Sequence, residues 1–101
     1  MFRQLVVLVF AILSCSPISV VMAESSLKAL IIDGQNNHDW KSTTPILSKH
    51  LEGTNLFAVH IATTPSQGKD MNGFAPNFAG YDVIVLNYNG EPWSSATQKA
   101  F

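Results

Sequence analysis

The sequence predicts an α/β domain built on a doubly wound parallel sheet, and three observations support this. Short apolar runs recur at residues 27–32, 56–63 and 81–86, each bounded by turn-forming residues. The first run is interrupted only by Lys28 and does not alternate, which is typical of a parallel strand covered on both faces. Helical or loop segments separate the runs, as expected for right-handed crossovers.

The segments between the strands are predicted from their capping residues, prolines and glycines. Thr44-Pro45 is typical of an N-cap followed by proline at the first helical position, and Gly53 is a natural stop, so a helix is expected over 45–52. Residues 34–43 are then a polar loop. Residues 64–80 contain three glycines and two prolines and are predicted to form a long loop.

A second helix is expected near the end of the sequence, capped by Ser94 or Ser95 and running to Phe101. Three strands with little more than one helix cannot cover both faces of a parallel sheet. We therefore expect residues 24–101 to be the N-terminal part of an incomplete domain that continues beyond Phe101.

The first 23 residues have the layout of a secretory signal peptide. Arg3 precedes an apolar run over 5–13, and Val21-Met22-Ala23 fits a cleavage site. The run is too short to span a bilayer, so no transmembrane segment is expected in the mature chain. The protein is predicted to be exported, to the periplasm or the extracellular space. The alternative is lipoprotein anchoring through Cys15.

Composition excludes several classes of partner and chemistry. The formal net charge is −1 and the lysines are scattered, which argues against nucleic acid as a partner. Cys15 is the only cysteine and lies in the predicted signal, so the mature chain has no disulfide and no thiolate metal ligand. The glycines match no phosphate-binding loop.

Two polar loops are the candidate ligand site. Residues 33–40 and 87–93 each follow a predicted strand, and ligands of open parallel sheets bind at the carboxyl ends of strands. Their mixture of amides and tryptophans suits a small polyhydroxylated molecule such as a sugar. The predicted catalytic residues are His38 and Asp39. The predicted ligand-binding residues are Asn37, Trp40, Asn87, Tyr88, Asn89 and Trp93.

Several of these residues have a second interpretation. His38 could act as an acid–base group, ligate a divalent metal, or only hydrogen-bond within its loop. Trp40 and Trp93 could anchor their loops instead of contacting a ligand. Asp33 and Glu91 are interpreted as a loop-bonding and a solvated carboxylate, although Glu91 could also serve as an acid or metal ligand.

The chain resembles the ThuA-like (trehalose utilisation) family. The resemblance is carried by Ala29-Leu-Ile-Ile-Asp-Gly-Gln-Asn-Asn-His-Asp-Trp-Lys-Ser-Thr-Thr-Pro-Ile-Leu47 and Tyr81-Asp-Val-Ile-Val-Leu-Asn-Tyr-Asn-Gly-Glu-Pro-Trp93 and extends over about 27–101. It implies a flavodoxin-like three-layer fold related to class I glutamine amidotransferases. In those relatives the loop after the third strand helps form an oxyanion site, a place that residues 87–90 would occupy here without the expected glycine pair.

The resemblance also implies a role in carbohydrate metabolism. Three hypotheses remain open at this point. The first is a sugar-related enzyme, and the second is a non-catalytic carbohydrate-binding module of a larger envelope enzyme. The third is an amidotransferase-like hydrolase whose nucleophile lies beyond Phe101. The reaction, the substrate, the need for a metal and the oligomeric state do not follow from the sequence.

Overall fold

The computed structural model describes residues 16–19 and 26–101. Apart from 16–19, the predicted signal peptide lies outside the described residues, as do Cys15 and the proposed cleavage site. All three predicted strands are present, within two residues of the expected bounds. The elements are β1 (Leu27–Asp33), α1 (Trp40–Gly53), β2 (Phe57–Thr63), the short 3-10 helix η1 (Phe78–Gly80), β3 (Val83–Leu86) and α2 (Ser95–Ala100).

The strands form a parallel sheet in the order β2-β1-β3. Leu30 of β1 is level with His60 of β2 on one side and with Ile84 of β3 on the other. This is the order of the first three strands of a flavodoxin-like sheet. The predicted α/β fold class is therefore confirmed, with β1 as the central strand.

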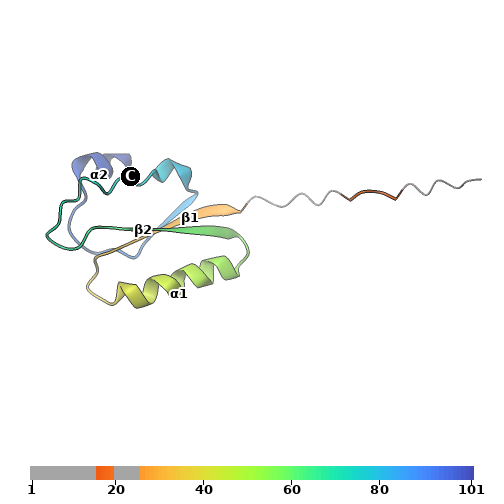
Figure 1. Cartoon of the computed structure of the whole chain (residues 1–101), viewed down its shortest axis with the longest axis horizontal. Helices are drawn as coiled ribbons and strands as arrows, with labels where there is room; N and C mark the ends of the chain where they lie inside the picture. Colours follow the sequence, from red (N-terminus) through yellow and green to blue (C-terminus); the bar gives the residue numbers. More distant parts are fainter. Residues whose placement is uncertain (1–15, 20–25) are drawn as a thin grey trace, which may run out of the picture.

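Helical segments lie on both faces of the sheet. Figure 1 shows α1 on one side and η1 with α2 on the other, which gives three layers. The layer that contains η1 and α2 is held to the sheet by a core cluster, which joins β1 to the long connection after β2. Its buried members are Leu30, Ile32, Phe74 and Phe78. Burying each side chain of this size contributes roughly 1.5–3 kcal/mol, so Phe74 and Phe78 fasten the long connection to the sheet.

Helix α1 begins five residues before the predicted start, so the expected 45–52 helix and 34–43 loop are corrected. Asp39 is the N-cap: its carboxylate accepts hydrogen bonds from the Ser42 backbone N–H at 3.2 Å and from the Ser42 hydroxyl at 2.6 Å. Thr44 is buried inside the helix and does not cap it. Pro45 lies within the helix and lacks the N–H that would bond to the Lys41 carbonyl.

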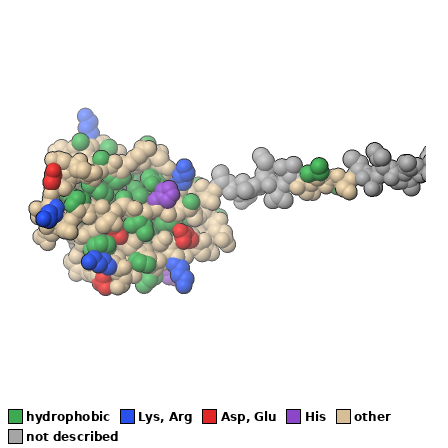
Figure 2. All heavy atoms as spheres, in the orientation of Figure 1, with side chains coloured by type: hydrophobic (Ala, Val, Ile, Leu, Met, Phe, Trp, Pro, Cys, Tyr) green, Lys and Arg blue, Asp and Glu red, His purple; other side chains and the backbone are tan. Residues whose placement is uncertain are grey.

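Charged side chains are scattered over the surface. In the view of Figure 2 acidic and basic side chains lie at the outline and over the lower part of the face, while apolar side chains gather across its middle. Among residues 16–19 and 26–101, no helix has the length and apolar character needed to cross a bilayer.

Gly34 makes the turn that leaves β1, and no other residue fits there. Its φ is +118°, a conformation that L side chains rarely adopt. A Cβ at this position would also overlap the backbone and the side-chain hydroxyl of Thr64. The loops after β1 and β2 therefore lie so close together that no side chain fits between them at position 34.

Replacing Gly34 with alanine is expected to lower the free energy of unfolding by roughly 2 kcal/mol or more, because strain and overlap combine. The matched control is Gly53→Ala, at the end of α1, where a Cβ meets nothing within 4 Å. That control should change stability by no more than about 1 kcal/mol. Urea unfolding of both variants checks the prediction, and equal midpoints would contradict it.

Candidate functional site

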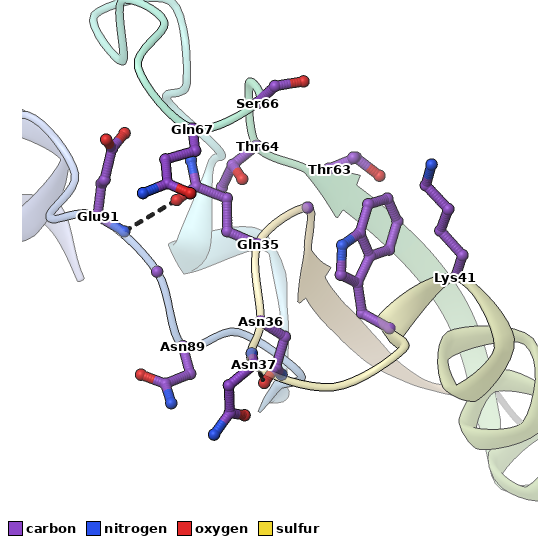
Figure 3. Close-up of a pocket in the computed structure, with 13 residues that line it drawn as sticks. Gln35, Asn36, Asn37, Lys41, Thr63, Thr64, Ser66, Gln67, Asn89 and Glu91 are labelled. Carbon is purple, nitrogen blue, oxygen red and sulfur yellow. Dashed lines mark hydrogen bonds between the residues drawn. The ribbon is translucent and has the colours of Figure 1, made fainter.

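A cavity of about 790 Å³ lies at the carboxyl ends of the three strands and opens to solvent. The loops after β1, β2 and β3 supply its wall, together with the first turn of α1 (Figure 3). This is the edge at which parallel sheets bind ligands. The lining residues are Gly34, Gln35, Asn36, Asn37, Trp40, Lys41, Thr63, Thr64, Ser66, Gln67, Asn89, Gly90 and Glu91.

Gln35 connects the three loops that form the cavity. Its side chain is buried, and Nε2 donates to the Pro65 carbonyl at 2.9 Å. Its Oε1 accepts the Glu91 backbone N–H at 3.0 Å (Figure 3). Its own carbonyl accepts the Asn89 N–H, also at 3.0 Å. One residue after β1 therefore sets the positions of the loops after β2 and β3.

The close approach of the third loop depends on a second glycine. A Cβ at Gly90 would overlap the Gln35 side chain. The loop after β3 can therefore lie against Gln35 only where it has no side chain. This contact brings Asn89 and Glu91 into the cavity wall on either side of Gly90.

Three of the predicted ligand-binding residues line the cavity: Asn37, Trp40 and Asn89. Trp40 is half-buried and begins the first turn of α1, and the Lys41 ammonium lies 5.7 Å from the centre of its ring. Asn37 and Asn89 are exposed. These positions agree with a ligand-binding role for the three residues, which stays a prediction.

The other three predicted ligand-binding residues do not line the cavity. Asn87 is buried, and its Nδ2 donates to the hydroxyls of Thr43 and Thr44, each at 3.0 Å. The loop after β3 is thereby tied to helix α1. A buried amide that is already bonded in this way has a structural role whether or not it meets a ligand.

Tyr88 and Trp93 belong to an aromatic cluster on the other side of their loop. The Trp93 ring lies 5.8 Å from that of Tyr88 and 5.6 Å from that of Phe74, between ring centres. Burial raises the pKa of the Tyr88 phenol, which donates to the Glu91 carbonyl at 2.6 Å. Both residues pack in the positions that loop anchors occupy.

The predicted catalytic pair, His38 and Asp39, is exposed and lies outside the set of residues that line the cavity. Asp39 caps α1, and the hydrogen bonds from Ser42 hold the pKa of its carboxyl below the ordinary value. His38 precedes the cap, and its carbonyl accepts the Trp40 N–H at 2.9 Å. A catalytic role for the pair stays a prediction.

Several lining residues were absent from the sequence prediction. They are Gln35, Asn36, Lys41, Thr63, Thr64, Ser66 and Gln67, whereas Glu91, which also lines the cavity, was considered as an acid or metal ligand. Gln35 and Asn36 lie in a loop that was singled out, so their neighbours pointed to them. Ser66 and Gln67 follow β2, and the strand-end argument applied to β1 and β3 would have found them too.

Asp33 is buried at the end of β1, where its side chain bonds to β2 and not to the loop amides that were expected. Its carboxylate accepts the Thr63 hydroxyl at 2.6 Å, and its carbonyl accepts the Thr64 N–H at 2.9 Å. In the described part of the chain, no three His, Cys, Asp or Glu side chains gather as a metal site. The possible metal at His38 therefore stays a hypothesis.

Comparison with known proteins adds one relative. No family model and no curated protein matches the chain. A crystal structure described as that of a ThuA-like protein from Parabacteroides merdae matches with 42% sequence identity and a TM-score of 0.74, over 76% of this chain. The chain is similar to a ThuA-like protein. It spans 28% of the length of that structure. The match supports the family name that the sequence resemblance suggested.

Removing the Asp39 cap gives a pH-dependent prediction. The folded-state pKa of Asp39 is lowered, so its contribution to stability is present above the unfolded pKa, near 3.8, and is lost as pH falls through the folded value. Asp39→Ala should therefore be less stable than wild type at pH 7, and this difference in stability should become smaller at low pH. Urea unfolding at several pH values measures this difference.

Asp39→Asn is the control for that experiment. Asparagine is a good N-cap residue and keeps an oxygen that can accept the Ser42 N–H, but it does not ionise. At pH 7 this variant should lie between wild type and Asp39→Ala in stability, and its difference from Asp39→Ala should not vary with pH. A stability loss in Asp39→Ala that is the same at every pH would contradict a role for the ionised carboxylate.

Proposed function

We propose that this domain binds a small neutral carbohydrate in the cavity at the carboxyl ends of β1, β2 and β3. The observation that carries the proposal is the cavity lining: side-chain amides and hydroxyls from three loops, together with the indole of Trp40. Amides and hydroxyls can both donate and accept, as sugar hydroxyls require. An indole offers an apolar face to the C–H groups of a sugar ring.

The size and setting of the cavity support the same proposal. Its volume of about 790 Å³ falls in the range of roughly 300–1,000 Å³ that is typical of small-molecule sites. The similarity to a ThuA-like protein supports it further, because the family resemblance implies carbohydrate metabolism, with trehalose as the eponymous sugar. Since the chain spans 28% of the matched structure, the activity of the whole protein belongs to this proposal as well.

The position of the predicted acid–base pair favours binding over catalysis within the described residues. His38 and Asp39 lie outside the cavity lining, whereas Asn37, Trp40 and Asn89 are part of it. This position favours a carbohydrate-binding module. The other candidate function is a sugar-related enzyme in which His38 acts as base or metal ligand. An activity screen alongside binding measurements separates the two, because a module binds without turnover.

We also propose that the protein is exported, with residues 1–23 as its signal peptide. The support is the sequence alone: Arg3, the apolar run over 5–13 and the small residues that end at Ala23. An exported carbohydrate-binding domain would act in the periplasm or outside the cell. Anchoring through Cys15 is the alternative outcome.

Trp40→Ala is expected to weaken binding of trehalose or maltose about fivefold or more, because an aromatic contact contributes about 1 kcal/mol beyond its buried area. Titration calorimetry of the full-length chain measures the change. Trp93→Phe is the control, since Trp93 lies in the aromatic cluster and not in the cavity wall. Loss of binding in the control with full binding in Trp40→Ala would contradict the proposed site.

Mass spectrometry of the mature N-terminus tests export. Cleavage after Ala23 predicts a mature chain that begins at Glu24, recovered from the periplasm or the medium. A chain that begins at a lipid-modified Cys15 would establish anchoring instead. An uncleaved chain retained inside the cell would contradict both forms of the proposal.

A further inference from the structure

Hydrogen bonds from its backbone and from its side chain hold Glu91 where the three loops meet. Its backbone N–H donates to Gln35 Oε1 at 3.0 Å, and its carbonyl accepts the Tyr88 hydroxyl at 2.6 Å. Its two carboxylate oxygens lie 3.0 and 3.1 Å from the backbone N–H of Gly68, which donates to them. The carboxylate is therefore positioned before any ligand arrives.

The carboxylate also supplies the negative charge of the cavity. Among the lining residues that the structure describes, Glu91 is the one acid and Lys41 the one base. Figure 3 places Glu91 beside Gln67 at one end and Lys41 at the opposite end. In the same view the Asn89 amide lies lower, towards Asn37, and points away from the Glu91 carboxylate (Figure 3). The Glu91 end consequently combines a fixed anion with the neutral amide of Gln67.

A fixed carboxylate selects ligands by the sign of the groups that it meets. An ionised carboxylate is an acceptor only and can take about four hydrogen bonds, so the contact with Gly68 leaves room for hydroxyl donors. Hydrogen bonds to a charged group are about twice as strong as neutral ones. A phosphate or carboxylate brought to the same place would meet like-charge repulsion.

We propose that Glu91 is a specificity-determining residue of this cavity. Its carboxylate makes the cavity bind neutral hydroxyl-rich ligands more tightly than their anionic derivatives. The proposal rests on the proposed carbohydrate-binding function. It assigns to Glu91 a direct contact with ligand hydroxyls, in addition to its part in holding the loop that contains Gly68.

Glu91→Gln separates the ligand contact from the loop contact. The amide oxygen of glutamine can still accept the Gly68 N–H, so the loop should keep its place while the charge is removed. Asp70→Asn is the matched control. It makes the same change of charge on a carboxylate that accepts one backbone N–H, from Asn72 at 2.9 Å, and that lies outside the cavity lining.

The test is titration calorimetry of the full-length chain with trehalose and trehalose 6-phosphate, in about 0.15 M salt so that distant charges are screened. Wild type and Asp70→Asn should bind trehalose more tightly than its phosphate. Glu91→Gln should bind trehalose at least tenfold more weakly and the phosphate no more weakly than wild type does. Thermal unfolding should show similar stability for all three.

The possible outcomes test the role of Glu91 separately from the proposed carbohydrate-binding function. If wild type binds trehalose and Glu91→Gln shows the same preference for trehalose over its phosphate, the role of Glu91 is overturned and the proposed function stands. An equal loss of both ligands in Glu91→Gln also overturns it, since that result indicates a purely structural residue. Wild type that binds neither sugar overturns both.

Discussion

The central strand β1 is the constraint on which the rest of the structure depends. It pairs with β2 on one side and β3 on the other, and helical layers cover both its faces. Ala29, Ile31 and Ile32 are completely buried, and Leu30 is nearly so. The middle of a strand in that position must be apolar, as residues 29–32 are, and the strand ends at the middle of the ligand edge. Asp33, Gly34 and Gln35 therefore emerge between the two neighbouring loops.

The first residues after β1 organise the cavity because of that central position. Gly34 allows the loop after β2 to approach, since no Cβ separates it from Thr64. Gln35 then bonds to the loops on both sides, through Pro65 and Glu91. A side chain with one donor group and one acceptor group can satisfy both neighbours at once. The ligand edge is in this way built from backbone contacts as much as from side chains.

Local signals predicted the strands well and the first helix poorly. The strands depend on runs of apolar residues, which are visible along the sequence. Two N-cap signals compete near α1, at Asp39 and at Thr44, and both are locally acceptable. In the folded chain Asp39 caps the helix, and the Thr44 hydroxyl instead accepts a hydrogen bond from the Asn87 amide, 43 residues away.

The sequence by itself determined the order of elements, the parallel sheet and the edge at which a ligand site would form. These follow from local apolar patterns and from the chirality of crossovers. Only the tertiary structure decided which polar residues share the cavity. Trp40 lines it while Trp93 packs in an aromatic cluster, and Glu91 joins it while His38 stays outside. The reason is that both loops are rich in polar residues, and the side on which each residue lies depends on long-range bonds through Gln35 and Asn87.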